Sequence, residues 1–337
     1  MPSVSIIIPC YNEQTTICTL LEAIYAQNFP RDNLELVIAD GMSIDGTRAQ
    51  IEGFANSHPD LYIKVVDNTK RHIPAGLNRA LKETRGDIII RLDAHSIPYP
   101  DYIDRCVADL EAGLGENVGG VWDIRPRTKT WMAQSIALAA AHPLGVGDAL
   151  YRHSEKSAAV DTVPFGAFKR ELLALVGSFD ETLLTNEDYE FNARIRKSGG
   201  KVWLDPSIRS VYISRATFTE LAKQYFRYGF WKWQMLRRYP GTLRMRQALP
   251  PLFVLSLFGL VVVGFFLTLF WILLAAELFV YIFILLAVGL QTAIKHKNFS
   301  FFFGMPLAIS FMHISWGAGF LWSMISGLFT NTAPEKN

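Results

Sequence analysis

The first two hundred residues alternate between short apolar runs and helical patterns. β-Branched runs lie at 3–8, 34–39, 62–67 and 87–92, and helical spacing follows them through about residue 26 and over 45–56, 75–84 and 101–111. Strands that alternate with helices of this length predict a parallel sheet with right-handed crossovers. The runs are apolar throughout, as expected for strands that are covered on both faces.

Beyond residue 250 the polar positions almost disappear. Residues 252–294 carry one charge, Glu277. Because one span needs roughly 20 residues, this stretch predicts two transmembrane helices, over 251–272 and 275–294, joined near 271–277. The uncharged stretch 299–329 predicts a third, kinked span over 301–328, with a re-entrant or interfacial hairpin as the alternative. A buried helical core is disfavoured because these helices have no polar stripe.

A different pattern separates these two parts. The stretch 218–239 reads FTELAKQYFRYGFWKWQMLRRY, which combines helical spacing of apolar side chains with five basic residues. A basic amphipathic helix rich in aromatic residues is typical of an anionic membrane interface. The alternative is an ordinary surface helix that packs on the preceding domain.

Charge divides the chain at the same place. Residues 1–220 carry 23 basic and 29 acidic side chains, and residues 221–337 carry 10 and 2. We therefore expect a soluble domain at 1–215, an interfacial segment at 216–249 and a membrane region at 250–330. Basic clusters at 237–246 and 295–297 flank the apolar stretches, and the positive-inside rule predicts that they and the soluble domain are cytoplasmic. The opening MPSVSIIIPCYNE has no basic segment before its short apolar run, so we expect a strand there rather than a signal peptide.

Polar side chains follow three of the predicted strands. Residues 9–13 follow the first strand, Asp40 follows the second, and Asp93 and His95 follow the fourth. Ligands of parallel sheets bind at the carboxyl ends of the strands, although a strand-end aspartate can also be a simple turn former. The sequence lacks G-x-G-x-x-G after the first strand and lacks a P-loop, which disfavours dinucleotide oxidoreductases and P-loop NTPases. Carboxylates at this edge suit a nucleoside diphosphate held through Mg²⁺ or Mn²⁺.

Four collinear segments resemble family 2 of the inverting glycosyltransferases. They are VSIIIPCYNE (4–13), VIADGMSIDGT (37–47), PAGLNRALKETRGDIIIRLDAHS (74–96) and a segment over 166–207 that contains TNEDYEFNARIRKSGG. The resemblance implies the GT-A fold, a Rossmann-like and mostly parallel sheet. A narrower resemblance, carried by PAGLNRAL, Asp-Ala-His and QYFRYG, points to membrane-anchored bacterial glucosyltransferases of the succinoglycan type.

The resemblance also assigns expected roles at the sheet edge. Pro9, Tyr11 and Glu13 would border the nucleotide base and ribose, and Asp40 would accept a hydrogen bond from the uracil N–H. Asp93 would reach the cation or the ribose. His95 stands where most relatives have the second Asp of Asp-x-Asp, and a neutral imidazole can still ligate Mn²⁺.

The catalytic base is expected in the acidic pair after Asn186. By resemblance, Asp188 would take the proton of the acceptor hydroxyl while Glu187 contacts substrate, because inversion needs one base opposite the leaving diphosphate. The alternative is that these acids only stabilise a helix N-terminus. Gln224 and Arg227 resemble the Gln-x-x-Arg-Trp segment of processive relatives, so Arg227 would bind a diphosphate or an acceptor phosphate, or alternatively lipid headgroups.

These expectations define one function and its rivals. The expected reaction is inverting transfer of a sugar, from UDP-glucose, to a polyprenyl-diphosphate-linked oligosaccharide in bacterial exopolysaccharide or surface-glycan biosynthesis. It would occur at the inner leaflet of the bacterial plasma membrane, with a divalent cation and without nucleic acid. The rivals are direct transfer onto polyprenyl phosphate and a non-catalytic scaffold that binds nucleotide sugars.

Overall fold

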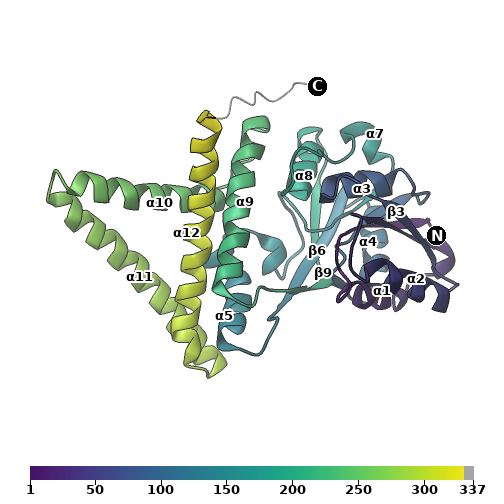
Figure 1. Cartoon of the computed structure of the whole chain (residues 1–337), viewed down its shortest axis with the longest axis horizontal. Helices are drawn as coiled ribbons and strands as arrows, with labels where there is room; N and C mark the ends of the chain where they lie inside the picture. The colour runs from purple at the N-terminus through teal and green to yellow at the C-terminus, as the bar shows by residue number, and fades with distance from the viewer. Residues whose placement is uncertain (330–337) are drawn as a thin grey trace. The chain divides into compact units, whose positions relative to one another are not determined.

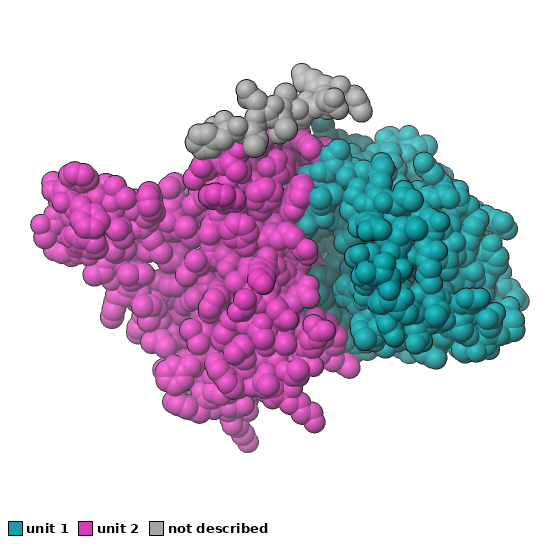
Figure 2. Space-filling view, in the orientation of Figure 1, with its two compact units in different colours: residues 1–123, 153–212 teal, residues 124–152, 213–337 magenta. Residues whose placement is uncertain are grey.

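The computed structural model describes residues 1–329. These residues form two compact units (Figure 2). Unit 1 comprises Met1–Asp123 and His153–Tyr212, and unit 2 comprises Ile124–Arg152 together with the chain from Ile213 onward. The segment 124–152 therefore clusters with the C-terminal helices, whereas the sequence placed it inside a domain at 1–215. Residue 330, the expected end of the membrane region, lies outside the described residues.

One mixed sheet forms the centre of unit 1. Its parallel part has the order β3-β2-β1-β4, made by β1 (Val4–Cys10), β2 (Leu34–Asp40), β3 (Tyr62–Asp67) and β4 (Ile88–Arg91). The order continues through β8 (Ala167–Lys169), β6 (Asn117–Arg125), β9 (Val202–Ile213) and β5 (Ile97–Pro98), while β7 (Ala158–Ala159) pairs with β9. β8 is antiparallel to β4 and β6. The expected parallel sheet is confirmed, and its antiparallel extension is a feature that the sequence did not predict.

Alternation along the strands divides the core between the two faces of the sheet. Ile6, Leu36 and Ile90 point to one face, where they form a cluster with residues of α1 (Ile17–Tyr25), α2 (Thr47–Ser57) and α4 (Tyr102–Glu111). The intervening residues, such as Ile7 and Val37, are also fully buried. α3 (Ile73–Leu81) packs against β1 and β2. Helices on both faces explain why these strands carry few polar residues.

Short elements complete unit 1. They are the 3₁₀ turn Arg31–Asn33, α7 (Leu172–Val176) and α8 (Glu187–Lys197). α8 begins directly after Asn186, which has a left-handed backbone with φ 72°. Three acidic residues occupy its first turn and three basic residues its last turn, an arrangement that the helix dipole favours.

Unit 2 is helical. It contains α5 (Trp131–Ala140), α6 (Pro143–Val146), the 3₁₀ turn Leu150–Arg152 and α9 (Phe218–Arg238), the helix predicted from the basic aromatic segment. The Thr217 side chain caps α9 by accepting a hydrogen bond from the Glu220 backbone N–H at 3.2 Å. α10 (Met245–Gly264), α11 (Leu269–His296) and α12 (Ser300–Phe329) follow, and Figure 1 shows α9 and α12 running side by side.

Three helices of unit 2 are long and apolar enough to cross a membrane, over 245–264, 269–296 and 300–327. The first two are separated by residues 265–268, not by 271–277 as the sequence suggested. Glu277 therefore lies inside α11, where its carboxylate accepts a hydrogen bond of 2.6 Å from the Ser256 hydroxyl of α10. The prediction erred because a lone charge in an apolar run looks like a turn until its partner on the neighbouring helix is known.

Candidate active site

The carboxyl edge of the parallel strands gathers most of the predicted site residues. Pro9 lies near the end of β1, Asp40 ends β2, and Asp93 follows β4 by two residues. The connecting loops contain non-glycine residues with positive φ, namely Asn12 (53°), Met42 (61°) and Arg71 (59°). Such backbone strain is uncommon and is concentrated at functional sites. Local strain thus adds support for a site at this edge.

Arg91, at the end of β4, joins three carboxylates. Its Nη2 donates to Asp93 Oδ1 at 2.8 Å and to Glu187 Oε1 at 2.9 Å, and its Nη1 donates to Asp188 Oδ2. The Arg91 side chain is only 3% exposed, whereas Asp93 and Asp188 are 24% and 22% exposed. A buried guanidinium with its donors in a fixed fork therefore holds the expected base beside the expected cation ligand.

This cluster carries more negative than positive charge. Burial disfavours the charged form of Arg91, but Asp188, Asp93 and Glu187 outweigh that effect and raise the pKa of its guanidinium. Burial, assisted by the charges of Glu187 and Asp93, raises the pKa of Asp188 above its ordinary value, and Arg91 only partly opposes this shift. Once ionised, a carboxylate with raised proton affinity is a stronger general base than an ordinary aspartate.

A second polar pair lies between the loops after β1 and β4. His95 Nδ1 contacts Glu13 Oε1 at 3.0 Å, and the Thr16 hydroxyl donates to the other Glu13 oxygen. Burial alone would raise the pKa of Glu13, but its bonds with His95 and Thr16 lower it. Because the ionised carboxylate can only accept, Nδ1 carries the proton in this pair.

Asp40 is fully buried and already has partners within the chain. It accepts hydrogen bonds from the Ser43 backbone N–H at 3.0 Å and the Ser43 hydroxyl at 2.5 Å, and it pairs with Arg48 Nε at 2.5 Å. Arg48 also bridges to Asp67 at the end of β3. The expected contact of Asp40 with a uracil N–H stays a prediction. It would have to form in addition to the bonds with Ser43 and Arg48.

The remaining predicted residues occupy different places. Tyr11 directly follows β1, the strand that contains Pro9, and its side chain is 42% exposed. Gln224 and Arg227 lie on α9 in unit 2, where Gln224 is buried and donates to the Tyr228 hydroxyl at 2.9 Å, and Arg227 is exposed. Their expected substrate contacts stay predictions.

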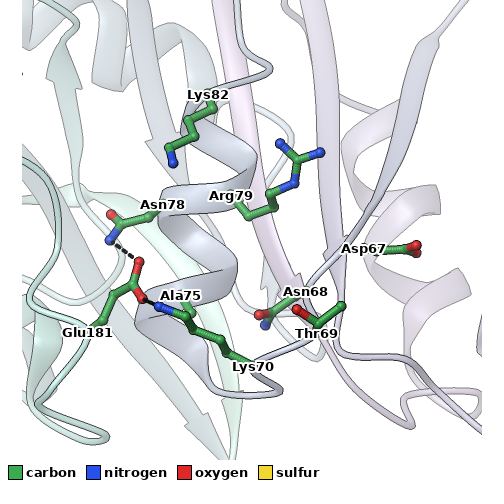
Figure 3. A pocket seen from close by; sticks show the side chains of 9 residues that line it. All are labelled: Asp67, Asn68, Thr69, Lys70, Ala75, Asn78, Arg79, Lys82 and Glu181. Atoms are coloured by element: carbon green, nitrogen blue, oxygen red, sulfur yellow. Dashed lines mark hydrogen bonds and ion pairs between the residues drawn. The ribbon is translucent and has the colours of Figure 1, made fainter.

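A surface pocket of about 160 Å³ opens beside α3 (Figure 3). Asn78 and Lys70 both point toward Glu181 in this pocket, at 3.0 and 2.6 Å. Asn78 also donates to the Phe179 carbonyl and accepts from the Phe179 N–H, each at 2.9 Å. The pocket thus marks where α3 fastens the loop that leads into α8 and its acidic pair.

The described residues contain no cluster of three His, Cys, Asp or Glu side chains with the geometry of a metal site. Asp93 and His95 together offer one carboxylate and one imidazole. Magnesium and manganese ions are often held by one or two protein ligands together with substrate phosphates. Asp93 and His95 therefore fit a cation whose remaining ligands include the oxygens of a bound diphosphate.

Sequence reasoning missed Arg91, Arg48 and Asn78. Arg91 had a readable signal, since a charged residue ends an otherwise apolar strand two residues before Asp93. Arg48 and Asn78 had none, because their partners lie on separate parts of the chain that only the fold brings together.

Comparison with known proteins agrees with this geometry. The sequence model of the family described as Glycosyl transferase family 2 matches residues 5–176. One relative is the dolichyl N-acetyl-alpha-D-glucosaminyl phosphate 3-beta-D-2,3-diacetamido-2,3-dideoxy-beta-D-glucuronosyltransferase of Methanococcus voltae, 26% identical over 97% of this chain and 98% of that protein. Another is the succinoglycan biosynthesis protein ExoA of Rhizobium meliloti, 32% identical over 73% of each chain.

A solved structure shares the fold. The mannosyltransferase PcManGT from Pyrobaculum calidifontis, in complex with GDP-Man and Mn²⁺, superimposes with a TM-score of 0.62 over 95% of this chain and 87% of that chain, at 24% identity. The predicted GT-A fold is therefore confirmed. With the family match over half of its length, the chain belongs to glycosyl transferase family 2 and is a glycosyltransferase.

Proposed function

We propose that this glycosyltransferase moves a sugar from a nucleotide-sugar donor to a lipid-linked acceptor, with inversion at the anomeric carbon. The observation that carries the proposal is the attachment of Asp93 and Asp188 to the single buried guanidinium of Arg91. In this proposal Asp93 serves the donor diphosphate and Asp188 serves the acceptor hydroxyl, because a single displacement needs a group on each side.

Asp188 acts as the general base in this proposal. Its carboxylate takes the proton of the acceptor hydroxyl, whose oxygen forms the new bond to the anomeric carbon, while the bond to the donor phosphate oxygen breaks. The nucleoside diphosphate leaves with that electron pair. Arg91 orients Asp188, and the raised pKa of Asp188 favours proton uptake. Glu187 accepts a hydrogen bond from Arg91 Nη2, whereas Asp188 accepts from Nη1, and Glu187 thereby helps to fix the guanidinium.

Asp93 and His95 would hold a divalent cation, Mn²⁺ or Mg²⁺. When bound, the cation stabilises negative charge that develops on the leaving diphosphate. The hydrogen bond that His95 Nδ1–H donates to Glu13 Oε1 orients the imidazole ring for this role. A structural relative contains Mn²⁺, which supports this assignment.

The relatives support a lipid-linked acceptor. The Methanococcus voltae protein is named for a sugar linked to dolichyl phosphate, and it aligns over nearly all of this chain. The Rhizobium meliloti protein is named for succinoglycan biosynthesis. We therefore propose UDP-glucose as donor and a polyprenyl-diphosphate-linked oligosaccharide as acceptor, in exopolysaccharide or surface-glycan synthesis at the cytoplasmic face of a bacterial membrane.

Pro9, Tyr11 and Asp40 would border the donor nucleotide, and Gln224 and Arg227 would contact acceptor or diphosphate. Direct transfer onto polyprenyl phosphate is a second candidate. It is favoured by a partial relative, 30% identical over 42% of this chain, named as an undecaprenyl-phosphate transferase from Pseudomonas fluorescens.

The test is sugar transfer by the detergent-solubilised full chain, with UDP- and GDP-sugars, Mn²⁺ or Mg²⁺, and a polyprenyl-lipid extract. Acceptor-dependent release of one nucleoside diphosphate is expected. Asp188→Asn should lower turnover by about 10²–10⁴-fold, as for loss of a general base. Asp32→Asn, on the exposed turn before β2, is the matched control. Full turnover in Asp188→Asn would refute the base, and nucleotide-sugar binding without turnover in the wild type would favour a scaffold.

A further inference from the structure

The helices of unit 2 do not run in one common direction. α9 and α12 lie side by side, whereas α10 and α11 form a hairpin whose turn lies far from both (Figure 1). Ring stacking joins Phe218 to Phe311 with centroids 5.2 Å apart, and Gln234 Nε2 donates to the Ser323 hydroxyl at 3.0 Å. These contacts show that α9 runs parallel to the second half of α12, from residue 311 to residue 323 and beyond.

Glycines on both helices make this contact close. A Cβ added at Gly229 would lie 2.1 Å from the Trp316 carbonyl oxygen, and one added at Gly319 would lie 2.1 Å from the Phe226 carbonyl oxygen. The two backbones therefore touch near the middle of α9. Helices in such contact share their depth and their tilt in a membrane.

α9 carries charge along most of its length. Lys223, Arg227 and Arg237 are exposed, and at a rise of about 1.5 Å per residue they extend over roughly 21 Å of helix. The hydrocarbon core is about 30 Å thick, and exposed basic side chains inside it are costly. α9 therefore belongs at the headgroup level, with its axis along the membrane surface.

The first half of α12 packs against α5 and α6 of unit 2. A Cβ at Gly304 would meet the Ser135 hydroxyl of α5 at 2.0 Å, and His313 Nε2–H donates to the Leu144 carbonyl of α6 at 2.9 Å. Only residues 300–310 precede the stretch beside α9, which is about 16 Å of helix. That length is too short for an independent crossing.

The exposed side chains of α12 form one apolar stripe. Its members are Phe303, Leu307, Phe311, Ile314, Trp322 and Ile325, at spacings of three, four or eight residues. The opposite face of α12, which includes Met305, Ile309 and Met312, is buried against α5, α9 and α11. The exposed stripe is therefore the face of α12 that is left for acyl chains.

The hairpin of α10 and α11 has the opposite character. Near its turn, Phe258, Phe265, Phe266, Ile272 and Phe279 are all at least 64% exposed. The backbone N–H groups of Phe266, Leu267, Phe270 and Trp271 all donate within the turn. Glu277, the one charge near this turn, is bonded to Ser256. This apolar turn, with these four backbone donors bonded, suits the hydrocarbon core.

We infer that α9 and α12 lie together in the plane of the membrane interface, and that the α10–α11 hairpin is the part of the described chain that enters the hydrocarbon core. The exposed basic side chains Lys223, Arg227 and Arg237 of α9 face anionic headgroups, and the apolar stripe of α12 faces acyl chains. Both ends of α12 then stay on the side of the membrane that holds the start of α10. This inference replaces the three-span expectation and is independent of the sugar transferred.

Labelling with a membrane-impermeant maleimide tests the topology. Single cysteines are introduced in a Cys18→Ser background, because Cys10 and Cys106 are buried. Leu243→Cys precedes α10, His296→Cys ends α11, Asn337→Cys ends the chain, and Glu111→Cys marks the side of unit 1. All four are expected to react in the same vesicle orientation. Reaction of position 337 alone from the other side would establish three spans, and reaction of position 243 from the other side would show that α9 crosses. Either result overturns the inference.

Depth measurements give a second readout. Spin labels at Phe303→Cys, Ile314→Cys and Ile325→Cys extend over about 33 Å of α12. The inference predicts equal depths within about 5 Å, reported by oxygen and nickel accessibility. Depths that run from one interface through the core to the other would overturn it. Leu267→Cys, at the hairpin turn, serves as the reference for an inserted position and should not react from the side of unit 1.

Discussion

Arg91 provides the sharpest test of the proposed site, because one side chain holds three carboxylates. In Arg91→Met, Asp93, Glu187 and Asp188 lose their shared cation while Glu187 stays buried. Removing one partner of a buried ion pair costs about 3–5 kcal/mol. For a unit of this size, each kcal/mol lowers Tm by about 2–4 °C, so the expected fall is about 6–20 °C.

The two buried cysteines of unit 1 provide an assay of its thermal unfolding. In a Cys18→Ser background, Cys10 and Cys106 react with a fluorogenic maleimide only when unit 1 opens, so heating with this dye reports unfolding of that unit in detergent. Arg79→Met is the matched control, since Arg79 is 44% exposed and pairs with Glu83 on the surface of α3. Such a pair contributes about 0.3–0.5 kcal/mol. Equal Tm values for the two variants would refute the assignment of Arg91 as the centre of the cluster.

Activity separates positioning from stability. Arg91→Lys keeps the charge but cannot bond all three carboxylates through a planar fork. Loss of one charge-assisted bond, at about 1.5–3 kcal/mol, should lower kcat by about 10–150-fold while the fold is retained. Wild-type kcat in Arg91→Lys at unchanged Tm would show that charge alone suffices.

Three further predictions concern stability. Burial and Asp205 raise the pKa of Asp109 to about 6, so its ionisation destabilises the fold as pH rises through that value. Asp109→Asn should raise the free energy of unfolding by about 1–2 kcal/mol at pH 7.5 in denaturant titrations. A gain in stability that persists below about pH 4 would contradict this cause. Asn78→Ala leaves both Phe179 backbone groups without their bonds and should cost about 2–3 kcal/mol and lower kcat, whereas Lys70→Ala, on the same carboxylate of Glu181, should cost less than 1 kcal/mol. Gly229→Ala should destabilise the α9–α12 contact by about 1–3 kcal/mol. Gly53→Ala, at a helical position with no atom near the added Cβ, should stabilise the protein by about 0.5–1 kcal/mol. A shift of Tm in the same direction for both variants would be inconsistent with the close packing.

Local sequence patterns predicted much of the fold. The β-branched runs and helical spacings located β1 to β4 and α1 to α4 within a few residues, because period and propensity act over neighbouring positions. The same pattern placed Asp40 and Asp93 at one sheet edge, since parallel strands end together. It did not find β5 to β8, which are two to nine residues long and acquire their pairing from distant segments.

The sequence by itself determined the strand-and-helix alternation, the family motifs and the amount of apolar helix, all of which are properties of short stretches. Tertiary structure alone decided that Arg91 meets Asp188, 97 positions away, and that residues 124–152 join the C-terminal helices. It also decided the surroundings of α12. Hydropathy describes one helix in isolation, but the depth of a helix in a membrane depends on the charges of the helix that it touches, and only the fold brings Gly229 and Trp316 together.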